Sequence, residues 1–209
     1  MKILKKFFNG FLKKLFGKKK QLKLGLYGPP NGGKTTLANK ICQDWIGEDM
    51  GSASAVAHET RTVTEKEKII IKRNGKELDF NLVDTPGIAT KIDYEDFIKK
   101  GLKKEEAKKR AKEATKGVIE SIRWLDEMDC VIVVLDATED PYSQVNITIV
   151  GNLQARDIPV LLVANKIDLK KASMKKIKSA FPQYEIVGIS AKYGKHLDKF
   201  YDALFKLVK

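Results

Sequence analysis

The chain has 209 residues, of which 43% are hydrophobic and 8% aromatic, and its formal net charge is +13. This length suits one well-filled domain with a short appendage, and the apolar content excludes an intrinsically disordered chain. No run of about eighteen apolar residues occurs, so the sequence predicts no membrane-spanning helix.

The first 20 residues carry most of the positive charge, because they contain eight lysines and no acidic residue. Apolar residues recur there in pairs, as in Phe7-Phe8 and Phe11-Leu12, which places them on one side of a helix and the lysines on the other. Such an amphipathic basic helix favours attachment to an anionic membrane surface. Binding of RNA phosphates and docking on a protein are the alternatives. We therefore divide the chain into a basic arm, residues 1–20, and a domain, residues 21–209.

Strand and helix signals alternate from residue 22 onward. The dipeptide Asn74-Gly75 predicts a hairpin turn between two of the strands. The alternation predicts an α/β fold with a doubly wound, mostly parallel sheet. The predicted strands are 22–27, 68–72, 78–83, 130–135, 160–164 and 186–189, and the predicted helices are 34–45 and 196–208.

Residues 90–127 are highly charged and have helical spacing. Mixed charges at this spacing are typical of a solvated helix, and the segment is also a candidate surface for a nucleotide-dependent partner. The expected apolar stripe comprises Ile98, Leu102, Ala107, Ala111, Val118, Ile122 and Leu125.

Residues 28–35 read GPPNGGKT and fit the phosphate-loop pattern GxxxxGK followed by Ser or Thr. Glycines allow backbone N–H groups to point at phosphate oxygens, and the N-terminus of the following helix adds partial positive charge. We expect Lys34 to reach the β- and γ-phosphates and Thr35 to bind magnesium. The expected phosphate-binding residues are Asn31, Gly32, Gly33, Lys34, Thr35 and Thr36.

Residues 84–87 read DTPG and directly follow the strand predicted at 78–83. We expect the carboxylate of Asp84 to hold magnesium through water. The N–H of Gly87 can approach a γ-phosphate because glycine has no side chain in the way. A DTPG sequence is also a good turn, but behind a phosphate loop it indicates a γ-phosphate sensor.

Residues 165–168 read NKID and follow the apolar run 160–164. The carboxylate of Asp168 can accept from both N1–H and the 2-amino group of guanine, a donor pair that adenine lacks. We expect Asn165 to brace the loop and the stem of Lys166 to cover the base. After the last predicted strand comes Ser190-Ala191-Lys192, where the N–H of Ala191 can donate to guanine O6.

The order and spacing of these motifs resemble those of the translation-factor-related GTPases, over about residues 22–209. GPPNGGKT is similar to the GxPNxGK form of the Era, TrmE and EngA branch. The sequence at 58–61, HETR, is similar to the first switch of that branch. The resemblance implies that Thr60 binds magnesium and senses the γ-phosphate, with Thr62 and Thr64 as alternatives. Bacterial Era carries an RNA-binding KH domain after its G domain, and no such module follows here, which weakens the case for a role in rRNA maturation.

The resemblance also bears on catalysis, for which the expected residues are Lys34, Thr60 and Gly87. Where Ras-like proteins have a water-positioning glutamine, this chain has Ile88, so we expect slow GTP hydrolysis. Asn31 matches the asparagine that helps to hold potassium in potassium-activated relatives. We therefore expect magnesium as cofactor and hypothesise stimulation by potassium.

These observations predict a GTP-binding switch that hydrolyses GTP to GDP. Expected partners are an anionic membrane surface, or alternatively RNA or the ribosome, together with a GTP-dependent second copy or an effector protein. Cys42 and Cys130 lie in apolar sequence without metal-ligand spacing, which predicts buried thiols in a reducing cytoplasm. The expected location is cytoplasmic, peripheral on the inner face of the cell membrane.

Overall fold

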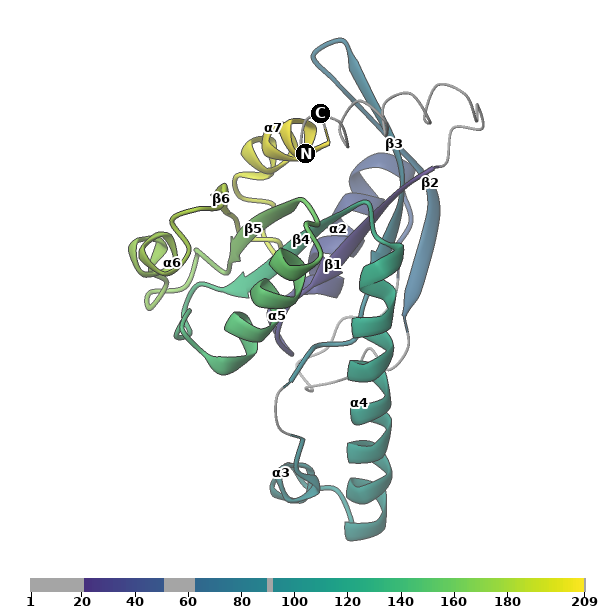
Figure 1. Cartoon of the computed structure of the whole chain (residues 1–209), viewed down its shortest axis with the longest axis vertical. Coiled ribbons are helices and arrows are strands. Elements are labelled where there is room, and N and C mark those ends of the chain that lie inside the picture. The colour runs from purple at the N-terminus through teal and green to yellow at the C-terminus, as the bar shows by residue number, and fades with distance from the viewer. Residues whose placement is uncertain (1–20, 51–62, 90–91, 209) are drawn as a thin grey trace.

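The computed structural model describes residues 21–50, 63–89 and 92–208, so the arm and Thr60 lie outside the described residues. Its centre is a six-stranded sheet in the order β2-β3-β1-β4-β5-β6 (Figure 1). Only β2 is antiparallel to its neighbour among these described strands, which confirms the mostly parallel α/β fold. The strands are β1 (Leu22–Tyr27), β2 (Thr64–Arg73), β3 (Lys76–Asp84), β4 (Cys130–Asp136), β5 (Val160–Asn165) and β6 (Ile186–Gly188).

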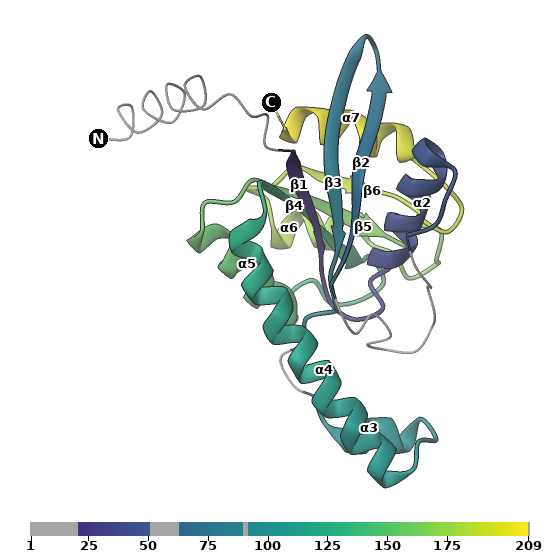
Figure 2. The ribbon, with the colours of Figure 1, turned by 90° about the vertical axis from the view of Figure 1, so that its right-hand side faces the viewer.

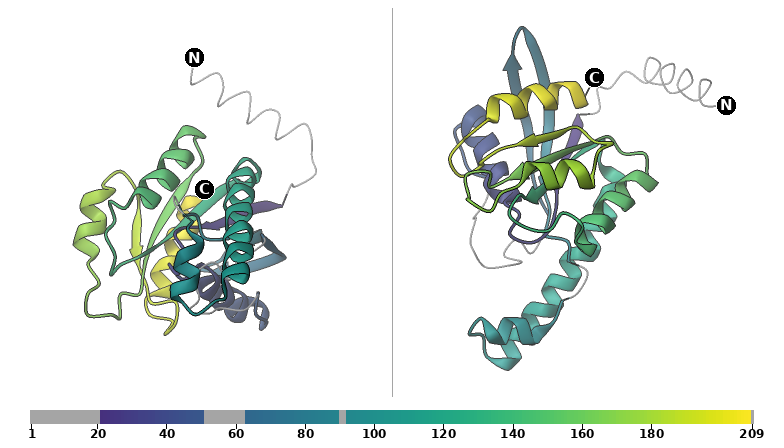
Figure 3. Two further views of the ribbon diagram at one scale, coloured as in Figure 1. Left: turned by 90° about the horizontal axis from the view of Figure 1, so that it is seen from below. Right: turned by 90° about the vertical axis from the view of Figure 1, so that its left-hand side faces the viewer.

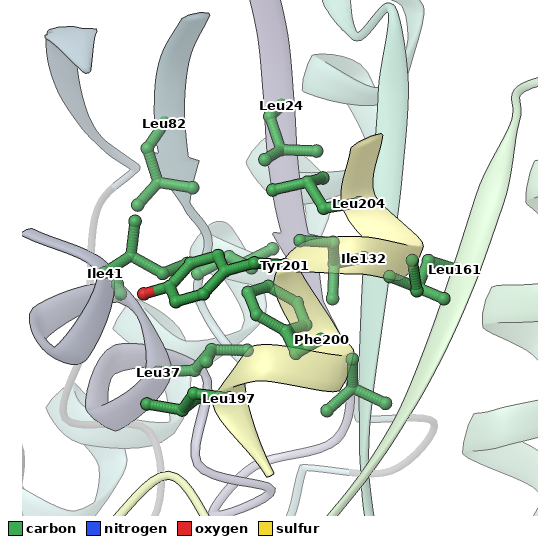
Figure 4. Packing of buried hydrophobic residues seen from close by; sticks show 14 of the residues in the cluster. Leu24, Leu37, Ile41, Leu82, Ile132, Leu161, Leu197, Phe200, Tyr201 and Leu204 are labelled. Atoms are coloured by element: carbon green, nitrogen blue, oxygen red, sulfur yellow. The ribbon is translucent and has the colours of Figure 1, made fainter. Parts of the chain in front are cut away.

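Helices cover both faces of the sheet. Figure 4 shows Leu37 and Ile41 of α2 beside Phe200 and Leu204 of α7, packed over the sheet residue Leu24. The other face is covered by α5, α6 and the end of α4, which continues into the 3₁₀ turn η1. The helices are α2 (Lys34–Ile46), α3 (Tyr94–Lys99), α4 (Lys104–Trp124), η1 (Leu125–Glu127), α5 (Gln144–Ala155), α6 (Met174–Ala180) and α7 (Leu197–Leu207).

The antiparallel β2–β3 hairpin turns at Asn74 and Gly75, as predicted. Their φ angles are 51° and 71°, the left-handed conformation that a two-residue hairpin turn needs. The register shifts between Lys66 and Ile69, where the N–H of Lys68 donates to Asn81 Oδ1 at 3.1 Å. This bulge interrupts the alternation of side chains. Because of this interruption, the alternation predicted only the part of the strand after the bulge, and β2 begins four residues earlier, at Thr64.

The helical segment predicted within 90–127 is a hairpin of two helices. Gly101, with φ of 95°, separates α3 from α4, and the long α4 carries α3 away from the sheet (Figures 2 and 3). Phe97 packs with Ala107 and Ala114 in a small separate cluster. Ile98, which we expected in the apolar stripe, is instead 38% exposed, because the break at Gly101 lets Phe97 face α4. No helix in the described ranges has the length and apolar content to span a membrane.

Candidate functional site

The carboxyl ends of four neighbouring strands place the sequence motifs at one edge of the sheet. The phosphate loop leaves β1, Asp84 ends β3, and Asn165 ends β5. Asp84 is in register with Leu26 of β1, and Asp136 of β4 is in register with Asn165. Ligands of open parallel sheets bind at this edge, at the point where the strand order reverses.

The phosphate loop places a glycine at the N-cap of α2, so the N-cap residue offers no side-chain cap. Gly33 is the N-cap residue, with φ of 94°, and no side-chain capping bond or acidic residue is found in the first turn of α2. A Cβ atom at Gly33 would lie only 2.2 Å from Asn165 Nδ2, so the position needs glycine. The N-terminal N–H groups and the helix dipole are consequently suited to an anion.

Lys34 is 6% exposed, although it carries an ammonium group. Its Nζ donates to the carbonyl oxygens of Pro29 at 2.9 Å and Gly28 at 3.3 Å. Burial lowers the pKa of Lys34 to about 8, and the charge of Asp84 offsets only part of this shift. The structure therefore holds a partly desolvated cation inside the phosphate loop, where a phosphate group would favour its charged form.

Asp84 and Thr35 place two oxygen atoms together beside this lysine. Thr35 Oγ1 donates to Asp84 Oδ2 at 2.6 Å. Asp84 is 1% exposed, and no donor among the described residues reaches its Oδ1 atom. Burial raises the pKa of Asp84, against the lowering effects of Thr35 and Lys34. A buried carboxylate oxygen without a donor, next to a hydroxyl, fits a hard cation such as Mg²⁺.

The segment after Asp84 is fastened to β1 and to the phosphate loop. Thr85 Oγ1 donates to the carbonyl of Leu26 at 2.7 Å, and the N–H of Ile88 donates to the carbonyl of Gly28 at 3.1 Å. A Cβ atom at Gly87 would lie 2.7 Å from Pro30 Cα. Glycine is thus what allows the two loops to approach so closely. The side chain of Ile88 is buried in the core, so it does not position a water molecule.

Ser121, which the sequence did not single out, connects α4 to this segment. Its hydroxyl lies 3.2 Å from the carbonyl of Pro86 and 2.9 Å from that of Gly117. The hydroxyl of Tyr27, the last residue of β1, donates to the carbonyl of Ser121 at 3.0 Å. Ser121 is fully buried. A displacement of residues 84–87 would therefore be felt directly at the base of α4.

Asn165 braces the site, as the sequence predicted. Its Nδ2 donates to the carbonyl of Gly32 at 3.0 Å, and its Oδ1 accepts from the N–H of Ala191 at 2.9 Å. One buried side chain thus joins the phosphate loop to the Ser190-Ala191-Lys192 loop. The N–H of Ala191, expected to donate to guanine O6, has Asn165 as its acceptor in this structure, so its pairing with guanine stays a prediction.

The expected base-binding residues lie around this brace. Lys166 Nζ pairs with Asp136 Oδ2 at 2.5 Å, and Asp168 is exposed in the turn that follows. Burial alone would raise the pKa of Asp136, but hydrogen bonds from Lys166 and Thr138 hold that pKa below its ordinary value. Asp136 was not predicted as a site residue, although its position directly after the apolar run 130–135 was the available signal. Lys192 is exposed beside the ring of Tyr193.

The remaining predicted residues are Asn31, Thr36, Thr60 and the two alternatives to Thr60. Asn31 is exposed on the phosphate loop, with φ of 59°, and Thr36 is partly buried in α2. Thr60 and its alternative Thr62 lie outside the described residues, whereas the other alternative, Thr64, is exposed at the start of β2. Their expected roles at magnesium, potassium or the γ-phosphate stay predictions.

Comparisons with known proteins agree with this geometry. Residues 23–166 match the family described as 50S ribosome-binding GTPase. GTPase Der of Lachnospira eligens is 30% identical over 196 residues, covering 89% of this chain and 39% of that protein. Mitochondrial GTPase Era of Danio rerio is 29% identical over 159 residues, covering 73% and 29%. The chain thus spans less than half the length of these relatives.

Solved structures of Era proteins are similar in fold to this chain. An Era variant from Aquifex aeolicus bound to GDP and AlF₄⁻ aligns with a TM-score of 0.67 and 25% identity, over 90% of this chain and 56% of that one. A structure of Era with MgGDPNP and nucleotides 1506–1542 of 16S ribosomal RNA aligns with a TM-score of 0.68 and 24% identity, over 91% and 57%. The family match covers more than half of the chain, and the motifs occupy their expected places in the fold. The chain therefore belongs to the 50S ribosome-binding GTPase family.

Proposed function

We propose that this chain is a slow GTP-hydrolysing switch that depends on Mg²⁺ and acts on the ribosome or its RNA. The observation that carries the GTPase part is the Thr35–Asp84 oxygen pair at 2.6 Å, next to the buried ammonium of Lys34. The other oxygen of Asp84, Oδ1, has no donor within the part of the chain that the structure describes. A cation site and a phosphate site thus adjoin at the N-terminus of α2. This combination is what a magnesium-bound nucleoside triphosphate requires.

The chain's own residues divide the work of binding. Lys34 would exchange its bonds to the loop carbonyls for bonds to phosphate oxygens, which stabilise its charge. Thr35 would bind magnesium directly and Asp84 through water, and the ion would neutralise charge that develops on the phosphates. Asp168 would read guanine, held in place by the brace that Asn165 builds.

The side chain at the position after Gly87 cannot orient the attacking water for hydrolysis. Ile88 is 4% exposed and belongs to the core. Intrinsic turnover should accordingly be slow, with the Gly87 N–H and Thr60 positioning the γ-phosphate. A potassium ion held by Asn31 is our proposed source of additional positive charge. Equal single-turnover rates in potassium and sodium buffers would rule out this role for potassium.

Three observations support a ribosomal target. The matching family is described as ribosome-binding, and the Era structure similar in fold contains a segment of 16S ribosomal RNA. The chain itself is strongly basic, which suits a polyanionic partner. Besides RNA, we propose a GTP-dependent second copy of the chain or an effector protein as a partner.

A membrane surface is the second candidate target, favoured by the pairing of phenylalanines with lysines in the arm. It would place the protein at the inner face of the cell membrane. The two targets need different parts of the arm, because lipid insertion uses apolar side chains whereas phosphate binding uses charge.

An arm variant separates these targets while keeping all the lysines. Phe7→Ser combined with Phe11→Ser should abolish co-sedimentation with anionic liposomes if the arm is a membrane helix. The same change should leave co-sedimentation with ribosomal RNA nearly intact. If the full chain binds neither ribosomal subunits nor ribosomal RNA in the presence of GTP analogue or GDP, the ribosomal proposal fails.

A further inference from the structure

The outward side of α4 carries a row of four lysines that the proposed nucleotide site does not use. All four are exposed and follow each other at intervals of four residues. Residues at this spacing are neighbours on one side of a helix, and the row extends over about 18 Å at a rise of about 1.5 Å per residue. We call this row the lysine ridge, and it consists of Lys104, Lys108, Lys112 and Lys116.

The ridge lies on the side of α4 that faces away from the protein. The buried positions of the helix include Ala107, Ala114 and Ser121, which share the opposite side. Ala107 and Ala114 are covered by Phe97 of α3. Packing against the rest of the molecule thus uses the other face of α4 and leaves the ridge to solvent. Figure 2 shows how α4 projects from the sheet.

The ridge belongs to a concentrated positive charge at the end of the projecting hairpin. Residues 99–116 contain nine lysines and arginines and three glutamates. One ridge lysine, Lys108, lies 3.3 Å from Glu105, but both side chains are largely exposed, and such pairs contribute little. Several like charges held within one face repel each other, and a polyanion would relieve that repulsion.

The face around the ridge favours nucleic acid over lipid. A helix that lies on a membrane needs an apolar side directed at the lipid, and the apolar side of α4 is already occupied by α3. The exposed large apolar residue of α4 is Ile119, near the base of the helix rather than at its charged end. A phosphate backbone, in contrast, requires only regularly spaced cations.

We infer that the lysine ridge is an RNA-binding surface that contacts the phosphate backbone. The inference rests on the proposed ribosomal function for the identity of the polyanion, and it assigns the contact to one face of one helix. Lysines on phosphates provide affinity and register without reading the base sequence. The ridge should therefore bind different RNA hairpins with similar affinity.

The test uses the full chain with bound GTP analogue and magnesium, and measures its affinity for a fluorescein-labelled RNA hairpin by anisotropy. A ridge variant replaces all four ridge lysines with glutamine. A control variant removes the same charge from exposed positions on and around α6 and α7. The control substitutions are Lys171→Gln, Lys175→Gln, Lys178→Gln and Lys199→Gln.

We expect the ridge variant to lose RNA affinity at least about tenfold more than the control. Each lost phosphate contact should reduce the slope of log affinity against log salt by roughly 0.7 to 0.9, so the four lysines together should reduce it by about 3. Unchanged GTP affinity in both variants would show that the G domain is intact. Vesicles of phosphatidylglycerol and phosphatidylcholine serve as the lipid probe.

The possible failures differ from one another. If the unmodified chain binds RNA but the ridge and control variants weaken equally, the ridge is not the contact surface, while the ribosomal function stands. If the ridge variant loses binding to vesicles and keeps binding to RNA, the ridge contacts lipid and the inference is overturned. If the unmodified chain binds no RNA, both the ribosomal function and the ridge are wrong.

Discussion

The edge of the sheet that carries the nucleotide motifs and the α3–α4 hairpin are held together by different kinds of contact. At the edge, the buried side chain of Asn165 ties two loops together, and that of Thr85 ties the segment after β3 to β1. The hairpin is held by one small apolar cluster around Phe97 and extends into solvent (Figure 3). The first arrangement fixes the relative positions of the loops, whereas the second presents a surface that fewer buried contacts hold. Ser121 and Pro86 join the two regions.

The largest effect is expected at the edge, from Lys34→Met. The substitution removes a buried cation whose charge-assisted bonds to phosphate are worth about 3 kcal/mol or more together, or roughly 100-fold in GTP affinity. Titration calorimetry with GTP measures this loss. Lys40→Met, at a half-buried position about one and a half turns further along the same helix where the ammonium pairs with Asp44, is the matched control and should change affinity less than about twofold. Similar losses in the two variants would mean that Lys34 does not bind phosphate.

Phe97→Ala tests whether the hairpin is a separate unit. Removal of this buried ring should destabilise α3 against α4 by about 3 kcal/mol, and hydrogen exchange in residues 94–112 should become much faster. GTP affinity should stay within about twofold of the unmodified chain, and Ile98→Ala, at the adjacent exposed position, should change neither property. A parallel loss of GTP binding would refute the division into two regions.

The lowered pKa of Lys34, about 8, predicts that nucleotide binding depends on pH. Bound phosphates favour the ammonium and raise this pKa, so binding above pH 8 must take up a proton. GTP affinity should then fall as pH rises above 8, approaching about tenfold per pH unit. Calorimetry in buffers of different ionisation enthalpy between about pH 7 and 8.5 counts the protons. Lys34→Arg should abolish the uptake, and an unmodified chain without uptake would show that Lys34 is already fully protonated.

The smallest effect is expected from Ser121→Ala, which removes the hydroxyl contact with the Pro86 carbonyl and leaves the bond from Tyr27 to the Ser121 carbonyl in place. Loss of one buried hydrogen bond should cost about 1 kcal/mol of stability. The difference in hydrogen exchange of α4 between GTP-analogue and GDP states should shrink. Thr115→Ala removes an exposed hydroxyl-to-carbonyl bond within α4 that does not reach residues 84–87, and is the control. Retention of the full difference in the serine variant would mean that another contact carries the signal.

The sequence predicted the edge far better than the hairpin. Fixed chemical requirements define the phosphate loop, DTPG and NKID, so their positions after strands could be read from residues such as Lys34, Asp84 and Asn165. Local periodicity could not show that Gly101 divides the charged segment, or that Ser121 would meet Pro86 from a distant position. Tertiary contacts decide such pairings.

The sequence did not predict helices α5 and α6, and the reasons are local. Helix α5 is rich in β-branched residues, including Val145 and Ile147, which have low helix propensity. Helix α6 has only seven residues. Their N-caps, Ser143 and Ser173, accept backbone N–H bonds and were the available signals.

The most direct test of the account is the choice between GTP and ATP. Calorimetry of the full chain with Mg²⁺ should show GTP binding at least about 100-fold tighter than ATP, because ATP would leave the carboxylate of Asp168 without its two donors. Equal affinity for the two nucleotides, or no binding of either, would contradict the assignment of this edge as a guanine-nucleotide site.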